Sequence, residues 1–478
     1  MRAALLVLVV ALFAGCPGPA IQDAGTDGGS SDSDAGADAG TDAGVVQRDL
    51  DVAVVKLTRA GVLDTTFGAG GKTVVDLGQA TGGARDTVYS LDVDAMGRVV
   101  LFGSTKAATG SDTDRFVTRL TTTGAVDTTF ATNGTFRVVG AGTSDNQRHG
   151  LVQSDGKILS AGYTSLPTGA IQADGGVQSA NAIVLVRLDS AGVADTTFGT
   201  AGVVSINPFP PTGTATLWGM CEAYAAVQQS SGRYVTGGYG RVAASGPVDV
   251  ASIRLENNGM RETTWNTTGA ITIDLIGADE RARHVSVLAD DRIVFAGSGT
   301  PLTGNIDALV AIRSVDGAAD TTFGTGGTKL YSFGRNDEAF WSSAVGPGGM
   351  SVAVAGYRVG AANTATENDD GVLAIIPVSM GAPAEFAEAV PMSDGTHDRF
   401  FGVAWDGMQV VAAGFVREGS DTQFAVARFN QDGTRDTTFG TNGVVKVNVT
   451  VGGGTEEVAR WVKVLSDGSI LLAGPTEH

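Results

Sequence analysis

Cysteine, histidine and basic residues are scarce in this sequence, and each shortage excludes a class of protein. The 478 residues include 2 cysteines and 4 histidines, and 32 Lys and Arg stand against 51 Asp and Glu. Two cysteines cannot build a disulfide framework. The formal net charge of −19 works against nucleic-acid binding, because neutralising phosphates requires clustered Lys and Arg. Only 17% of residues are charged and 69 are glycine, which favours strands and tight turns, so we expect an all-β fold.

The few histidines and cysteines do not assemble into a chemical motif. Cys221 has no neighbour in the sequence that would lower the pKa of its thiol, so we expect a small buried side chain. The histidines show neither a Ser/His/Asp order nor a metal-ligand spacing, and we expect each to be a polar residue in a loop or at the start of a strand: His149, His284, His397 and His478. The segment 430–433 lacks the oxygen spacing and closing Glu of an EF-hand calcium loop. We therefore expect no catalytic residue, no metal and no cofactor.

The N-terminus predicts a signal peptide over residues 1–15. Met1 and Arg2 precede an apolar run over 3–13, which is shorter than the roughly 20 residues that cross a bilayer as a helix. The following Phe13-Ala14-Gly15-Cys16 resembles the lipobox of bacterial lipoproteins. That resemblance implies that Cys16 is acylated and becomes the mature N-terminus. The alternative is an ordinary secretory signal peptide that leaves Cys16 as a stray thiol.

Residues 16–48 are predicted to form a disordered tether. Between Pro17 and Gly44 there are six Asp, no basic residue and no aromatic residue. Such a segment cannot bury enough apolar surface to offset its ordering entropy, and its like charges keep it extended. A cation-binding Asp repeat would need a fixed geometry that a Gly/Ala background does not provide. We expect a spacer that holds a domain away from a membrane.

The remainder, 49–478, is a repeat array. The marker Asp-Thr-Thr-Phe-Gly or a variant of it is centred on six aromatic residues: Phe67, Phe130, Phe198, Trp265, Phe323 and Phe439. The interval from Phe323 to Phe439 is about twice the others, which predicts a seventh copy with an erased marker near Phe386. A strand-like segment occurs seven times, at 51–57, 115–120, 182–188, 249–255, 307–313, 371–377 and 423–429. A second, ending in Gly, also occurs seven times, at 98–103, 157–162, 233–238, 292–297, 351–356, 409–414 and 469–474.

Four strands can be drawn in each repeat of about 62 residues. Asp-Gly pairs such as Asp155-Gly156 are the favoured two-residue hairpin turns, so each repeat is predicted to be an antiparallel meander. The size and pattern predict a seven-bladed β-propeller, with a solenoid as the alternative. The array begins with the second half of a repeat and ends after the first half. We therefore expect 51–57 to pair within the blade that contains 469–474, which closes the ring and removes open sheet edges.

With these residues in view, the unit resembles the delta-60 repeat, a family of bacterial β-propeller repeats. The resemblance rests on the Asp-Gly hairpin, the strand ending in Arg-Leu, the Asp-x-x-Phe-Gly turn and the Gly-Val strand that follows. It implies a propeller and no established activity. The Asp/Ala/Gly-rich tether is similar to those of lipoproteins from predatory, gliding deltaproteobacteria. Because the marker recurs in nearly every repeat, we assign it a structural role in the blade.

One constellation points to a binding site. Eight positions before the hairpin Gly or its equivalent, each repeat carries an Arg or an aromatic residue: Tyr89, Arg148, Tyr224, Arg283, Trp341, Arg399 and Arg460. If this strand is the innermost of its blade, these side chains surround the mouth of the central channel. Such a ring suits anionic or carbohydrate ligands, through bidentate hydrogen bonds and ring stacking. The alternative is that each Arg forms an ion pair with an acidic residue of a blade turn.

These observations predict a cell-envelope lipoprotein, in the outer membrane by the usual sorting pattern because Pro17 and not Asp follows Cys16. The propeller would be a monomeric scaffold that binds a protein or glycan partner, anchored by lipid and without nucleic acid. The alternative is a propeller enzyme, such as a lyase, a lactonase or a quinoprotein-like oxidoreductase, with its site at the channel mouth.

Overall fold

A computed structural model describes the repeat array almost completely. The described residues are 49–77, 85–106, 113–138, 144–171, 177–209, 219–243, 246–275, 278–301, 304–335, 337–360, 368–393, 396–450 and 456–477. The predicted signal peptide 1–15, Cys16 and the predicted tether 16–48 lie outside them. No helix among the described residues is long and apolar enough to cross a membrane.

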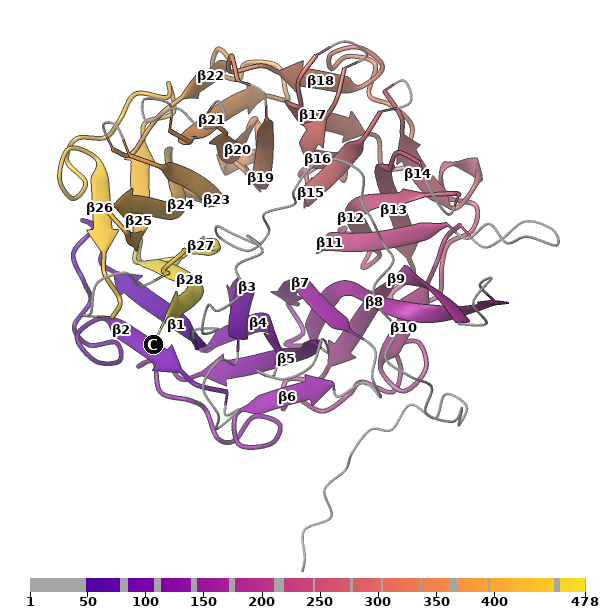
Figure 1. Cartoon of the computed structure of the whole chain (residues 1–478), viewed down its shortest axis with the longest axis horizontal. Coiled ribbons are helices and arrows are strands. Elements are labelled where there is room, and N and C mark those ends of the chain that lie inside the picture. Colours follow the sequence, from indigo (N-terminus) through magenta and orange to yellow (C-terminus); the bar gives the residue numbers. More distant parts are fainter. Residues whose placement is uncertain are drawn as a thin grey trace, which may run out of the picture.

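The strands form antiparallel groups of four that are arranged around a common centre (Figure 1). Five groups are separate sheets: β7 (Asp145–Val152), β8 (Ile158–Ile171), β9 (Val177–Leu188) and β10 (Val203–Ile206); β11 (Met220–Gln228), β12 (Tyr234–Arg241), β13 (Asp249–Leu255) and β14 (Ala270–Ile273); β15 (Glu280–Val287), β16 (Ile293–Gly299), β17 (Asp307–Arg313) and β18 (Thr328–Tyr331); β19 (Glu338–Val345), β20 (Ser351–Arg358), β21 (Asp370–Pro377) and β22 (Phe386–Ala389); β23 (Asp398–Asp406), β24 (Gln409–Glu418), β25 (Asp421–Phe429) and β26 (Val444–Val447). Two short 3₁₀ turns, η1 (Trp265–Thr267) and η2 (Pro347–Gly349), lie between strands.

An eight-stranded sheet contains both ends of the array. It joins β3 (Arg85–Val93), β4 (Val99–Lys106), β5 (Thr113–Leu120) and β6 (Thr135–Val138) to a group made of β27 (Trp461–Val464), β28 (Ile470–Glu477), β1 (Leu50–Leu57) and β2 (Lys72–Val75). A single parallel bridge, Leu50 to Arg85, links these two groups. β1 and β28 pair antiparallel in an unbroken register from Leu50–Glu477 to Leu57–Ile470. The predicted pairing of 51–57 with 469–474 is therefore present.

The third strand of each group is apolar on both faces because its sheet packs face to face with its neighbours. In β13, every residue after Asp249 is buried, and similar runs form the core between adjacent sheets. Continuous apolar strands are typical of sheets covered on both sides. Cys221 lies in this core, where burial raises the pKa of its thiol, so the predicted structural role of this residue is supported.

The marker turn is a structural device. The Asp Oδ1 accepts the backbone N–H and the hydroxyl of the second Thr, with Thr Oγ1 to Asp distances of 2.5–2.6 Å in five repeats. The hydrogen bond from Thr66 and the ammonium of Lys56 hold the pKa of Asp64 at about 2. The marker ring packs on a glycine of the next repeat, as Phe67 does on Gly124, whose φ of +86° no side chain adopts easily.

The repeat that lacks the marker sequence also packs an aromatic ring on a glycine of the next repeat, but the ring comes from a different position. Phe386 is the first residue of β22, a strand, whereas the marker rings belong to the turn before the equivalent strand. Its ring nevertheless lies against Gly433 of the next repeat, the glycine equivalent to Gly124. The predicted copy near Phe386 is thus present as a packing contact without the Asp-Thr-Thr turn.

An arginine joins four of the marker turns to the next repeat. In four repeats the Arg near the end of the third strand forms an ion pair with the marker acid and covers the marker ring, and its Nη1 donates to a backbone carbonyl of the following turn: Arg119, Arg187, Arg254 and Arg428. Arg428 makes this bond to Arg59, near the start of the array. The first repeat carries Lys56 in this place, 2.9 Å from Asp64.

Another set of equivalent residues in the repeats was not recognised in the sequence. Near the start of six innermost strands stands a buried acid: Asp86, Asp145, Glu280, Glu338, Asp398 and Glu457. Where its bonds are defined, this carboxylate accepts backbone N–H groups of the connection from the preceding sheet. Glu338, for example, accepts those of Phe333 and Arg335 at 2.6 and 2.7 Å. These acids satisfy connecting backbone that would otherwise be buried without partners.

Candidate functional site

The innermost strands carry a β-bulge at the same place in six groups. The bulge skips one residue of the innermost strand in its pairing with the second strand, and the skipped residues are Tyr89, Arg148, Tyr224, Arg283, Trp341 and Phe401. In the remaining group, Arg460 stands directly before β27. A bulge re-aims a side chain and interrupts the alternation of a strand. Two consecutive residues can then face the centre, as Arg283 and His284 do.

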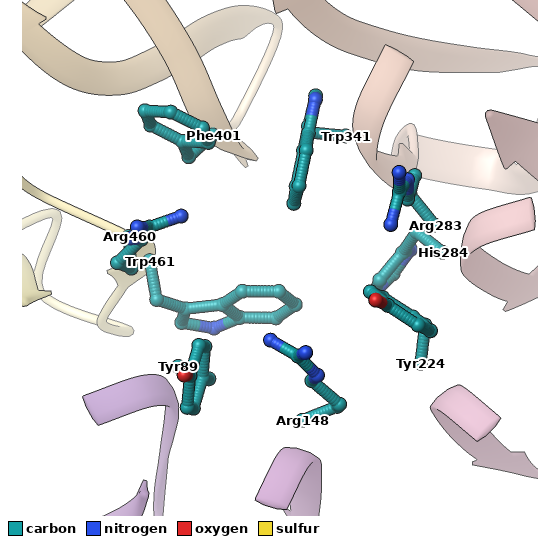
Figure 2. A pocket seen from close by; sticks show the side chains of 9 residues that line it. All are labelled: Tyr89, Arg148, Tyr224, Arg283, His284, Trp341, Phe401, Arg460 and Trp461. Atoms are coloured by element: carbon teal, nitrogen blue, oxygen red, sulfur yellow. The ribbon is translucent and has the colours of Figure 1, made fainter. Parts of the chain in front are cut away.

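These residues surround one pocket at the centre of the ring (Figure 2). It encloses about 410 Å³ including its open mouth, and nine residues line it: Tyr89, Arg148, Tyr224, Arg283, His284, Trp341, Phe401, Arg460 and Trp461. Six of the seven residues predicted to form the channel mouth are among them. The sequence did not indicate Phe401, Trp461 or His284.

Arg399 is the exception, because the spacing between its strand and its turn differs. Asp406 pairs with Gln409, so Gly407 and Met408 form a two-residue turn. Elsewhere five or six residues separate the paired ends, as between Val93 and Val99 or between Val345 and Val352, so the prediction of two-residue Asp-Gly turns is wrong for those repeats. Counting back from Gly407 therefore selects a residue two positions before the bulge. Counting three positions forward from the buried acid near the start of the strand, here Asp398, would have found Phe401.

Arg399 instead agrees with the alternative prediction, because it forms an ion pair with an acidic residue. Its Nη2 lies 2.7 Å from Asp369 Oδ2, and its guanidinium covers the Tyr357 ring at 4.3 Å. The Arg399 guanidinium helps to hold the pKa of Asp369 below its usual value against the effect of burial. Arg399 is an ion-paired residue beside the pocket and does not line it.

The three pocket arginines are interleaved with aromatic rings. Arg283 lies between Tyr224 and Trp341, with its guanidinium carbon 4.8 Å from each ring centroid. Arg148 lies between Tyr89 and Tyr224 at 4.9 and 4.7 Å. Arg460 covers Phe401 at 4.8 Å. Contacts of this kind between a cation and a ring hold the guanidinium planes in place.

An aromatic cluster lies beside this ring: His149, His284 and Trp461, with centroid distances of 5.1–5.4 Å. The prediction that His149 and His284 are polar residues in loops or at strand starts is wrong, because each follows a bulged arginine and is turned inward. Burial lowers the pKa of His149 to about 4 and holds that of His284 well below its usual value. Both rings are therefore neutral at pH 7.

The Ser343 backbone N–H donates to His284 Nδ1 at 3.2 Å, so the proton of this neutral ring is on Nε2. His284 Nε2 is buried and has no hydrogen-bond partner in the described part of the chain. It is a buried N–H donor on a residue that lines the pocket.

The charge of the pocket is opposite to that of the protein. Three arginines and no carboxylate are among the nine lining residues. Glu222 is a buried acid beside the pocket residues. Burial raises its pKa, although Arg148 and Arg283 act to lower it. Asn181 Nδ2 donates to Glu222 Oε1 at 2.6 Å. The site can therefore present positive charge, aromatic faces and a neutral imidazole N–H to a ligand.

Comparison with known proteins supports the fold. A family described as "Domain of unknown function (DUF5122) beta-propeller" matches residues 153–198 and 406–439. Solved structures that are similar include polysaccharide lyase Uly1 (12% identity, 88% of this chain and 98% of that chain, TM-score 0.41) and Sqt1 from Chaetomium thermophilum (12%, 82% and 94%, 0.39). Trypanosoma rangeli sialidase in complex with the inhibitor DANA is similar at 13% identity, over 79% and 59% of the two chains, with a TM-score of 0.42. No curated protein matches. The chain has a β-propeller fold, and likenesses this remote say nothing of its activity.

Proposed function

We propose that this propeller is a binding module whose central pocket takes a carboxylate-bearing glycan. The observation that carries the proposal is the ring of three guanidinium groups interleaved with four aromatic residues, without a carboxylate among the lining residues. Guanidinium groups bind carboxylates through paired hydrogen bonds, and aromatic faces stack on the apolar faces of sugar rings. The two chemistries alternate around one pocket, as an acidic sugar requires.

The arginines and the aromatic residues of the pocket would contact different parts of the ligand. Arg148, Arg283 and Arg460 would attract the carboxylate, and their stacking reduces the side-chain entropy lost on binding. Trp341 and Phe401, which contact each other edge to face at 5.3 Å, form the longest uncharged stretch of the ring and would contact the sugar face. The His284 Nε2 proton would donate to a hydroxyl or carboxylate oxygen.

The pocket favours binding over hydrolysis. Glycoside hydrolysis uses a pair of carboxylates that flank the scissile bond, and none of the nine lining residues is Asp or Glu. A lyase remains the enzymatic alternative, because it needs a neutralised carboxylate and a base. Incubation with uronate polysaccharides would then yield unsaturated products that absorb in the ultraviolet, whereas a binding module yields none.

Replacing a pocket arginine is expected to weaken acidic-glycan binding. Arg283→Gln should raise the Kd by roughly tenfold to a hundredfold, because a charge-assisted hydrogen bond contributes about 1.5–3 kcal/mol. Arg283→Lys keeps the charge but loses the fork, and should give a smaller loss. The measurement is a glycan array with acidic and neutral sugars, followed by titration calorimetry at two salt concentrations.

Arg399→Gln is the matched control, because Arg399 is a neighbouring arginine outside the pocket. We expect it to reduce stability through the loss of the Asp369 ion pair while the Kd for the glycan stays within about twofold. Equal binding of neutral and acidic sugars, or equal losses in the Arg283 and Arg399 variants, would contradict the proposal.

We further propose that the module is a monomeric seven-bladed ring closed by the β1–β28 pairing, displayed from the outer membrane on the 16–48 tether. The pairing register supports closure. The lipobox-like segment before Cys16 supports the anchor, and it implies that the ligand is an envelope or extracellular glycan.

The anchor is testable through one residue. Cys16→Ala is expected to abolish incorporation of labelled fatty acid and to move the protein from the membrane fraction to the soluble envelope fraction. Since Cys16 lies far from the propeller in sequence, the thermal stability should not change. Fatty-acid labelling that persists in the Cys16→Ala protein would exclude this site of acylation.

A further inference from the structure

The central pocket is closed at one end by three aromatic side chains that meet across the channel. His149, His284 and Trp461 belong to the innermost strands β7, β15 and β27, and no two of these strands are neighbours around the propeller (Figure 1). Their ring centroids nevertheless lie 5.1–5.4 Å apart. Side chains of separated strands come this close only near the axis of the propeller. We call these three side chains the floor of the pocket.

The floor lies on one side of the pocket arginines. Each floor residue directly follows one of these arginines in the sequence: Arg148-His149, Arg283-His284 and Arg460-Trp461. A strand advances about 3.3 Å per residue, so the floor lies one step further along the innermost strands than the arginines. His284 and Trp461 line the pocket and His149 does not. His149 therefore supports the other two rings from behind.

Figure 2 shows the Trp461 indole lying across the middle of the pocket, inside the circle of arginines and aromatic residues. Beyond the floor, Lys463 Nζ lies 2.8 Å from Asp92 Oδ1, and this ion pair joins β27 to β3. The described residues thus close the channel at this level. The pocket is a blind recess, and a polymer chain cannot pass through its floor.

The floor presents one buried hydrogen-bond donor. His284 is 6% exposed, and its Nε2 has no hydrogen-bond partner in the described part of the chain. The Ser343 backbone N–H donates to His284 Nδ1, so Nε2 carries the proton. A buried donor without an acceptor is unfavourable, and a ligand oxygen at the floor would satisfy it.

The arginines and the floor would contact neighbouring groups of the ligand. Since Arg283 and Arg460 directly precede His284 and Trp461, a carboxylate held by the arginines lies beside the floor. In a hexuronic acid, one hydroxyl is on the carbon next to the one that bears the carboxylate, and the anomeric carbon lies across the sugar ring from this hydroxyl. A sugar that enters with its carboxylate first therefore places this hydroxyl at the floor and its anomeric carbon at the mouth.

We propose that the pocket binds the non-reducing end of an acidic glycan, a terminal hexuronic acid, and excludes the same sugar within a chain. This inference rests on the proposed function and adds which sugar of the chain is bound. An internal hexuronic acid carries the next sugar on the hydroxyl that faces the floor, so that it would collide with Trp461 and leave His284 Nε2 without an acceptor. The pocket volume of about 410 Å³, toward the small end of the roughly 300–1,000 Å³ of ligand sites, suits a single sugar.

Titration calorimetry of the full-length protein with two isomeric trisaccharides tests the proposal. Each contains one glucuronic acid and two glucose residues, and the glucuronic acid is either at the non-reducing end or in the middle, where the hydroxyl next to its carboxylate-bearing carbon is linked to glucose. We expect a Kd at least about tenfold lower for the terminal isomer, because the internal isomer meets a closed floor. The two isomers carry the same charge, so attraction to the arginines alone would give equal Kd values.

Trp461→Ala opens the floor and should lower the ratio of the two Kd values at least about threefold. Trp461→Phe keeps an aromatic side chain at the floor and should preserve most of the ratio. Trp405→Ala is the matched control, because Trp405 is also on an innermost strand, β23, but does not line the pocket, and we expect an unchanged ratio. Both isomers are titrated into the same protein preparation, so a partial loss of folded protein cancels in the ratio.

The outcomes separate this inference from the proposed function. Equal Kd values for the two isomers, with binding of both weakened by Arg283→Gln, would overturn the recognition of a chain end and leave the acidic-glycan proposal standing. Failure of both isomers to bind would overturn both proposals. A preference for the terminal isomer that Trp461→Ala and Trp405→Ala leave equally unchanged would overturn the role of Trp461 in closing the pocket.

Discussion

A chain that ends at Gly468 is expected not to fold cooperatively, although it lacks only ten of the 478 residues. The truncation removes β28, which pairs with β1 over eight residues and with β27 on its other side. Ile470, Leu471 and Leu472 are at most 1% exposed, and losing one such large side chain costs about 2–5 kcal/mol. Their combined loss is comparable to the whole 5–15 kcal/mol stability of a typical domain.

Circular dichroism and size exclusion measure this outcome. The truncated protein should aggregate or show a broad thermal transition, because β1 and β27 become open sheet edges. Deletion of residues 1–44 is the control: it removes far more of the chain but no described strand, and we expect an unchanged transition temperature. A truncated protein that melts sharply at the full-length temperature would show that the β1–β28 pairing does not hold the ring together.

Arg187→Met is expected to lower the free energy of unfolding by about 3–5 kcal/mol, the range for removing one partner of a buried ion pair. Arg187 is 2% exposed, its Nε lies 2.8 Å from Asp195 Oδ2, and it covers the Phe198 ring at 4.6 Å. Its Nη1 also donates to the Tyr234 hydroxyl at 3.0 Å and to the Asn257 carbonyl. The substitution therefore leaves Asp195 with only the part-exposed Lys157, whose Nζ lies 3.1 Å from Oδ2, as counter-ion, and it loosens the junction between two sheets.

Chemical denaturation of the Arg187→Met and Arg233→Met variants compares the stability lost with a buried ion pair to that lost with an exposed one. Arg233 is 37% exposed and lies 3.2 Å from Glu256 Oε1, so its replacement should cost at most about 1 kcal/mol. Adding Asp195→Leu to Arg187→Met should recover part of the loss, because it removes a largely buried carboxylate that has lost its buried counter-ion. Similar losses in the two single variants would contradict the assigned role.

The repeated strands were predictable because their pattern is local. The third-strand segments of the sequence, such as 249–255, coincide with observed strands. The ion pair of this strand's arginine with the marker acid, and its hydrogen bond to the next repeat, were not predicted, although Arg-Leu recurs at the end of this strand. The reason is that its acceptors, Asn257 for Arg187 and Arg59 for Arg428, belong to the next repeat.

The pocket was predictable only as far as the turns are regular. Six of the seven positions were found by counting back from the turn glycine or its equivalent. In the seventh repeat the count selected Arg399 instead of Phe401, because Gly407 lies six rather than eight positions after the bulge. His149 and His284 could not be found by counting, since a bulge sends two consecutive side chains to the same side. Trp461 was missed in the same way, because it directly follows Arg460. No local pattern marks that bulge.

By itself the sequence determined the class of fold, the strand pattern of the repeat, the turn chemistry of the marker and the complementary halves at the two ends of the array. These follow from backbone preferences and the burial of alternating or continuous apolar residues, which act over a few positions. Tertiary structure alone decided which arginines face the centre and how Phe386 replaces a lost marker. Each of those depends on which residues of neighbouring sheets are brought together, and packing between sheets sets that.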